Sequence, residues 1–366
     1  MEQESPIVLV SILGLVLGLV FGGTAQRTNF CTMGAISDAV FMGDWNRFRA
    51  WMLAIAIAIL GSQVLHIGGV LDLNGSIYLT PNLGWAGAIV GGTLFGFGMT
   101  MTGGCGNKTL VRLGAGNLKS LIVVIFLGIF AYMTLRGLTG LARVELEGIL
   151  NINLEARGIN DQGLPTFLSF LGLSDLTARL SSTGLITLGI FWFVFKSAEF
   201  RASKANLTGG FIIGLLIPTA WYVTGVIGLD DFEPTPLTSL SFVAPVGESI
   251  QYLMTFTGST INFGIAVVAG VIAGSFLAAK LSGEFKIEAF TDSKDMIRHM
   301  IGASIMGFGG VLALGCTIGQ GITGMSTLAL GSVLALGSIF LGGYYGLKYM
   351  EEGTLSGALA AVFGRN

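Results

Sequence analysis

The chain has 366 residues, of which 52% are hydrophobic and 11% charged, and its mean hydropathy is +0.78. Soluble domains carry roughly a quarter charged residues, so this composition excludes a soluble globular protein and predicts an all-α polytopic protein in a lipid bilayer. The net charge of −2, with no basic patch among the aromatic residues, argues against nucleic acid as a partner.

Apolar runs taken in chain order predict nine membrane spans. We expect them at about 7–23, 50–71, 83–103, 118–135, 184–195, 207–229, 256–279, 300–315 and 328–347. Lysine and arginine gather in alternate connections, which by the positive-inside rule predicts the N-terminus outside and the C-terminus in the cytoplasm. The stretch 136–179 is mixed in charge and is expected to be an external loop with one or two interfacial helices.

A repeated motif organises the chain. The segment GGTLFGFGMTMTGGC at 91–105 recurs as GASIMGFGGVLALGC at 302–316, and the offset between the two cysteines, 316 minus 105, is 211 residues. We expect one transmembrane domain with repeat one at 7–135, a linker and fifth span at 136–205, and repeat two at 206–348. The odd number of spans between the copies predicts an inverted repeat.

Each copy is an apolar helix that ends in Gly-Cys and is followed by a glycine-interrupted polar stretch, which predicts a helix that breaks within the membrane. The backbone N–H groups that open the next segment lack partners and favour an anion. A thiol is a weak donor that would hold an anion loosely, as conduction requires. The candidate residues at the two breaks are Gly104, Cys105, Asn107, Lys108, Gly315, Cys316, Thr317 and Gln320.

Packing alone is the competing explanation for each of these residues. A lone buried cysteine usually behaves as a small hydrophobe, but two at equivalent breaks favour function. Cys31 has no counterpart in the second copy, and Arg27 and Lys108 also fit simple positive-inside markers. Glu248 could face a cavity or lie in a loop. The three cysteines form no C-x-x-C pair, so a disulfide scaffold is not expected, and neither a cofactor nor a metal site is predicted.

The chain resembles the YeeE/YedE family of sulfur-compound transporters over nearly its whole length. The resemblance is carried by Arg27-x-x-Phe30-Cys31, by Gly103-Gly104-Cys105, by Gly274-Ser275-Phe276 with Lys280, Glu284 and Phe285, and by MGFGG and GCTIGQG within 306–321. It implies a bacterial or archaeal inner-membrane protein with nine spans and short re-entrant helices in an hourglass.

The resemblance also implies a function. It predicts uptake of thiosulfate or a similar small anion, a path lined by Cys31, Cys105 and Cys316, and a cytoplasmic partner that is a small sulfurtransferase of the TusA kind. It implies a transporter and not an enzyme. Two alternatives stay open: a transporter of another sulfur or selenium species, and a membrane thiol oxidoreductase, although such enzymes normally need paired cysteines.

Overall fold

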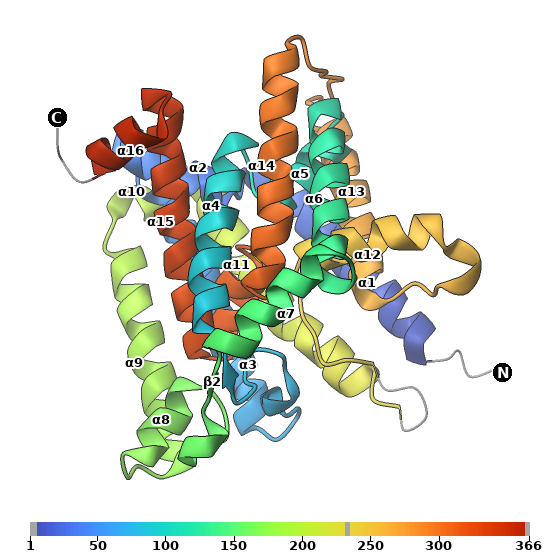
Figure 1. Ribbon diagram of the computed structural model, residues 1–366. Helices are drawn as coiled ribbons and strands as arrows, with labels where there is room; N and C mark the ends of the chain where they lie inside the picture. Colours follow the sequence, from blue (N-terminus) through green and yellow to red (C-terminus); the bar gives the residue numbers. More distant parts are fainter. Residues whose placement is uncertain (1–5, 231–234, 363–366) are drawn as a thin grey trace.

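The computed structural model describes residues 6–230 and 235–362 and is almost wholly helical (Figure 1). Within these residues, eight helical segments are long and apolar enough to cross a membrane: 6–42, 46–67, 87–114, 118–136, 175–195, 204–227, 263–281 and 330–352. The expectation of a polytopic all-α membrane protein is therefore confirmed. The first five residues, and part of the acidic loop after Leu229, lie outside the described residues.

The described part of the first half contains six α-helices. They are α1 (Pro6–Thr28), α2 (Thr32–Ser37), α3 (Asn46–Ile67), α4 (Gly92–Met101), α5 (Gly106–Gly114) and α6 (Leu118–Arg136). The π-helical turns Asp38–Met42 and Gly87–Gly91 continue α2 and lead into α4. A 3₁₀ turn lies at Leu73–Gly75.

The middle of the chain departs from expectation in one place. It contains α7 (Thr139–Leu150), a 3₁₀ turn at Glu155–Arg157, α8 (Leu164–Phe170), α9 (Asp175–Phe195) and α10 (Ala198–Ala202). The amphipathic stretch assigned to the external loop is divided between α8 and α9. Ser174 accepts a hydrogen bond from the backbone N–H of Thr177 and so caps α9, which begins nine residues before the expected start at Gly184. A two-residue antiparallel pair, β1 (Asn82–Leu83) with β2 (Ile152–Asn153), ties this region to the first half.

The second half contains α11 (Lys204–Tyr222), a π-helical turn at Val223–Ile227, α12 (Val243–Met254), a 3₁₀ turn at Phe256–Gly258, α13 (Phe263–Leu281), α14 (Ser293–Leu312), a π-helical turn at Gly319–Gly324, α15 (Leu330–Glu352) and α16 (Leu355–Val362). Although α14 was predicted as a span, it is not among the eight apolar segments. The reason is that Lys294, Asp295 and Arg298 fall in its first two turns.

The two motif helices break at equivalent residues. Helix α4 ends at Met101 and α14 at Leu312, which differ by the same 211 residues as the cysteines. The backbone N–H of Gly104 donates to the carbonyl of Met99, and that of Gly315 donates to Gly310, so the same hydrogen bond closes both helices. The prediction that neither helix continues through its cysteine is confirmed.

Helices of the two halves pack in reciprocal pairs. Helix α1 packs on α13 as α11 packs on α3, and α4 packs on α15 as α14 packs on α6. Between the motif helices, Gly98 approaches Gly302 while Gly91 approaches Gly309, so α4 and α14 run antiparallel. In repeat order, the counterparts of α1, α3, α4 and α6 are α11, α13, α14 and α15. Replacing each helix by its counterpart leaves the set of packed pairs unchanged, as a pseudo-twofold axis would require. The repeat boundaries and the hourglass outline stay predictions.

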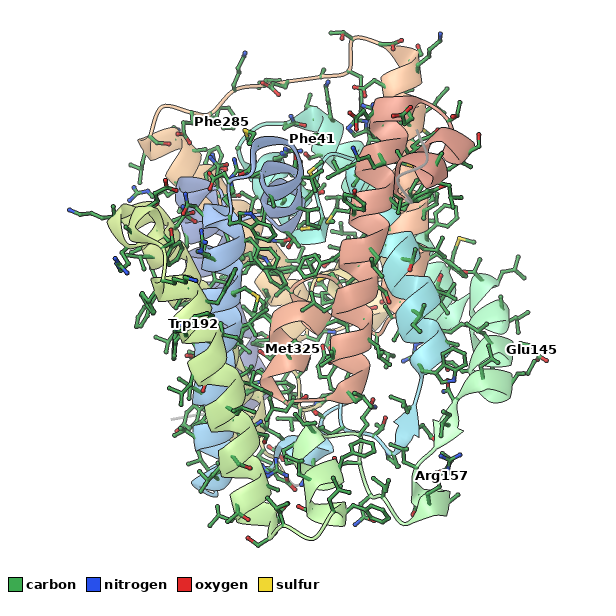
Figure 2. The ribbon with its side chains drawn as sticks, turned by 90° about the vertical axis from the view of Figure 1, so that its left-hand side faces the viewer. Phe41, Glu145, Arg157, Trp192, Phe285 and Met325 are labelled. Atoms are coloured by element: carbon green, nitrogen blue, oxygen red, sulfur yellow. The ribbon has the colours of Figure 1, made fainter. Side chains whose placement is uncertain are left out.

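Close helix packing explains much of the glycine content. A Cβ added at Gly22 would lie 2.2 Å from the carbonyl oxygen of Val271, and one at Gly274 would lie 2.1 Å from that of Leu19. Only glycine allows two helix backbones to approach this closely. Figure 2 shows the two ends of the resulting bundle, with Phe41 and Phe285 at one end and Arg157 at the other.

Candidate functional site

Cys105 lies deep in the bundle, immediately before α5. Its side chain is fully buried, and its thiol donates to Oδ1 of Asn107 at 2.5 Å. The next residue, Gly106, packs against Leu127, which is the central residue of α6. The broken helix therefore delivers this thiol to about the middle of a membrane-crossing helix.

Cys31 reaches the same place from the connection between α1 and α2. Its sulfur accepts a hydrogen bond from the backbone N–H of Gly34 at 3.4 Å, which caps α2, and the side chain is buried. The Cys31 and Cys105 side chains lie beside one another. The preceding Phe30 is also buried and stacks on Trp51, with ring centroids 6.4 Å apart. This stacking holds the non-helical segment in position.

Cys316 follows the second break and is also fully buried. Its sulfur accepts from the backbone N–H of Gly319 at 3.3 Å. The adjacent Thr317 lies beside Cys105. Its hydroxyl is buried, and so is that of Thr32 next to Cys31, yet neither has a hydrogen-bond partner among the described residues. Unfilled hydrogen-bonding capacity thus gathers around the three cysteines.

A cavity of about 250 Å³ approaches this cluster from the end of α13 at Leu281. Lys108 lines it and is itself buried, and its ammonium donates to Oδ1 of Asn29 at 2.9 Å. Arg112 also lines the cavity and donates to the carbonyl of Gly103 at 2.8 Å. Neither cation forms an ion pair among the described residues, although two carboxylates lie at the rim. Such cations favour an anion nearby.

A second cavity, of about 290 Å³, approaches from the opposite end of α13, at Phe263. Its lining includes Gly315, the residue before Cys316, together with Glu248 and Arg143. The two cavities open at opposite ends of α13, which has 19 residues and is therefore about 28 Å long. The buried cysteines lie between them.

The remaining predicted residues are placed differently. Gln320 uses its side chain to stabilise the second break, donating to the carbonyl of Ala313 and accepting from Ser332. Glu248 accepts from the amide of Asn262 at 2.8 Å inside the second cavity. Arg27 is exposed in the last turn of α1.

Gly104 connects the first break to α5, and its carbonyl accepts from the Thr102 hydroxyl at 2.8 Å. Sequence reasoning missed Asn29, which positions Lys108. A signal for it existed, because asparagine tolerates a left-handed backbone and Asn29 has a φ of +52° where α1 ends before Cys31.

These features define a class of protein: a polytopic helical membrane protein whose two broken helices bring thiols and hydroxyls together between opposed cavities. The family model for sulphur transport matches residues 27–345, and the chain belongs to this family. The resemblance to the YeeE/YedE family is therefore confirmed.

Curated relatives carry names that agree with this assignment. The chain is 29% identical over 319 residues to the thiosulfate transporter TsuA of Escherichia coli (strain K12), covering 84% of this chain and 86% of that protein. It is 28% identical over 316 residues to the thiosulfate transporter TsuA of Spirochaeta thermophila, covering 85% and 90%. A shorter match, 29% over 106 residues, covers 28% of this chain and 24% of the probable transporter YedE of Escherichia coli. The protein is thus a sulfur-compound transporter by family.

Proposed function

We propose that the protein takes up thiosulfate, or a closely related small sulfur-containing anion, across the inner membrane of a bacterium. One observation carries the proposal. Two cavities approach the buried Cys31, Cys105 and Cys316 from opposite ends of α13, and the hydroxyls of Thr32 and Thr317 beside them have no hydrogen-bond partner in the part of the chain that the structure describes. A dehydrated anion would supply the missing acceptor atoms. The names of the two long relatives support thiosulfate as the anion.

Weak donors suit passage better than one tight cationic site. Moving an anion through hydrocarbon requires its lost hydration to be replaced, yet binding must be weak enough for release. Thiols are weak donors with polarisable sulfur, and backbone N–H groups already point at two of the three sulfurs. The anion would therefore contact the three cysteines in turn, without a disulfide forming between them.

Charge supports the proposed orientation in the membrane. The cavity that holds Lys108 and Arg112 lies at the end of the bundle where Lys280, Lys286 and Lys294 also lie, and basic connections face the cytoplasm. This orientation puts the cavity that holds Glu248 outside, with the N-terminus outside and the C-terminus in the cytoplasm. A small sulfurtransferase of the TusA kind would receive the anion at the basic cavity.

The closeness of Cys31 to Cys105 is the observation that favours a membrane thiol oxidoreductase as an alternative. An oxidoreductase would need this pair to cycle between dithiol and disulfide. Transport needs only free thiols. We therefore propose that the protein is a transporter and not an enzyme.

Uptake of ³⁵S-labelled thiosulfate by the purified protein in liposomes tests the proposal. Wild-type liposomes should accumulate label above protein-free liposomes, and should do so equally with a permeant reductant that keeps the thiols reduced. Uptake that requires oxidised thiols would favour the oxidoreductase. Competition by sulfite, sulfate and selenite identifies any other preferred species, and absence of thiosulfate uptake contradicts the proposal.

A further inference from the structure

Two hydroxyl groups lie where the second cavity approaches Cys316. Tyr78 and Ser241 both line this cavity and converge on Gly319, whose N–H donates to the Cys316 sulfur. A Cβ added at Gly319 would lie 2.6 Å from Oγ of Ser241 and 3.6 Å from the phenolic oxygen of Tyr78. Gly319 therefore leaves open the small space that these two hydroxyls and the thiol share. Tyr78 also lies close to Cys316.

Aromatic packing anchors the Tyr78 ring and the segment that carries Ser241. The Tyr78 ring packs edge-on against Trp221, with centroids 6.4 Å apart, and the indole N–H of Trp221 donates to Oγ of Ser326 at 3.1 Å. Next to Ser241, the buried Phe242 ring packs on Phe21 with centroids 5.0 Å apart. Aromatic packing thus positions the Tyr78 ring and the backbone next to Ser241.

Neither hydroxyl is used by the part of the fold that the structure describes. No hydrogen bond among residues 6–230 and 235–362 involves the Tyr78 phenol or the Ser241 hydroxyl. This is so even though Tyr78 is buried, with only 5% of its surface exposed. Burial raises the pKa of the Tyr78 phenol, so the group keeps its proton and remains a donor. Two pre-positioned neutral donors without acceptors are what an oxyanion site provides.

The charged groups of the cavity already have partners. Arg143 forms an ion pair with Glu147 at 3.1 Å and donates to the carbonyl of Thr134, and Glu248 accepts from Asn262. The carboxylate of Glu147 offsets the Arg143 charge. Selectivity at the inner end of this cavity must therefore come from the neutral donors of the cavity. Hydroxyl groups suit sulfonate oxygens, while the Cys316 thiol suits a terminal sulfur.

We propose that Tyr78 and Ser241 determine the specificity of the outer site: their hydroxyls bind the sulfonate oxygens of a small anion whose terminal sulfur faces Cys316. This inference rests on the proposed function and adds the residues that select the substrate. The ligand class is a tetrahedral sulfur oxyanion with one sulfur substituent. The two hydroxyls bind the oxygen end of the anion, and the thiol contacts its sulfur end.

The test measures thiosulfate binding to the detergent-purified protein by calorimetry, and uptake by the same protein in liposomes. Tyr78→Phe and Ser241→Ala each remove one hydroxyl while keeping the packing, and each should weaken binding about tenfold and raise KM with little change in the maximal rate. Tyr132→Phe removes a phenol on α6 that does not line the cavity and should leave both unchanged. Gly319→Ala fills the shared space and should abolish binding.

The outcomes separate the two proposals. Unchanged affinity in both Tyr78→Phe and Ser241→Ala overturns the assignment of these hydroxyls while wild-type uptake keeps the proposed function. Binding that depends on the hydroxyls without uptake by the wild type supports the site and overturns transport. Absence of thiosulfate binding to the wild type overturns both. A lower maximal rate at unchanged KM would show that the hydroxyls do not select the substrate.

Discussion

Gly103 and Leu314 occupy equivalent positions in the two halves, and both have a left-handed backbone, with φ of +67° and +58°. Each lies two residues before its cysteine, where the chain leaves the motif helix and turns back. The second half therefore keeps, with a leucine, a conformation that ordinarily favours glycine. Retention of this conformation by such different residues indicates that the turn itself is required to place Cys105 and Cys316.

The first prediction concerns this turn. Gly103→Ala should lower the free energy of unfolding by about 1 kcal/mol, because a side chain disfavours positive φ. The added Cβ would meet only the Arg112 guanidinium, at 3.6 Å, so there is room for it. The loss of stability would therefore report backbone strain alone. Gly148→Ala, in α7 with nothing within 4 Å, is the control and should not destabilise. Thermal unfolding in detergent measures both, and equal melting temperatures would contradict the prediction.

The second prediction concerns the paired glycines of the motif helices. A Cβ at Gly96 would lie 2.1 Å from the carbonyl oxygen of Ile339 on α15, and one at Gly307 would lie 2.5 Å from that of Leu127 on α6. Gly96→Ala and Gly307→Ala should each destabilise the protein by about 1–3 kcal/mol or more, because two backbones must separate. Gly337→Ala, also on α15 but with open space, should be tolerated. Similar yields and melting temperatures for all three variants would show that the reciprocal packing is wrong.

Much of this architecture could be predicted from the sequence because it depends on local signals. Apolar runs located the long helices, and the repeated Gly-Cys located both breaks, which the structure places at Met101 and Leu312. The start of α9 was missed, because the polar residues around Ser174 indicated a loop although Ser174 caps the helix.

The site was only partly accessible to sequence reasoning. Tyr78 and Ser241 lie in connecting segments far apart in the chain, and only tertiary packing around Gly319 brings their hydroxyls together. Gln320 was predicted at the right break, but composition could not show that its amide would be used by Ala313 and Ser332. Distances between segments, and not residue types, carry this information.

The third prediction concerns Lys108. Lys108→Met should slow thiosulfate uptake about tenfold and reduce its dependence on salt inside the liposome, because a buried cation at the cavity raises the local anion concentration. Lys286→Met changes a lysine in the same cavity that is 78% exposed and lies 4.0 Å from Glu288. Solvent screens that charge, so the rate should change less than twofold. Equal effects of the two substitutions would argue against a specific role for Lys108.

The last prediction concerns the thiols. Cys105→Ala and Cys316→Ala should each abolish uptake, and Cys31→Ala should reduce it strongly, because alanine removes the donor and the polarisable sulfur from a buried path. Ser182→Ala, a small buried change in α9, should leave uptake unchanged. Membrane insertion and elution on size exclusion must match the wild type for the comparison to hold.

Serine separates the two ways in which a thiol could act. A hydroxyl is the stronger donor of similar shape, so Cys105→Ser would keep the hydrogen bond to Asn107 while losing the sulfur. Retained uptake in Cys105→Ser would show that donation suffices. Loss of uptake in a variant that still inserts would show that contact between the thiol and the sulfur of the anion is needed. Undiminished thiosulfate-dependent growth of a strain that carries the triple alanine variant would contradict a path through these three residues, whichever way the thiols act.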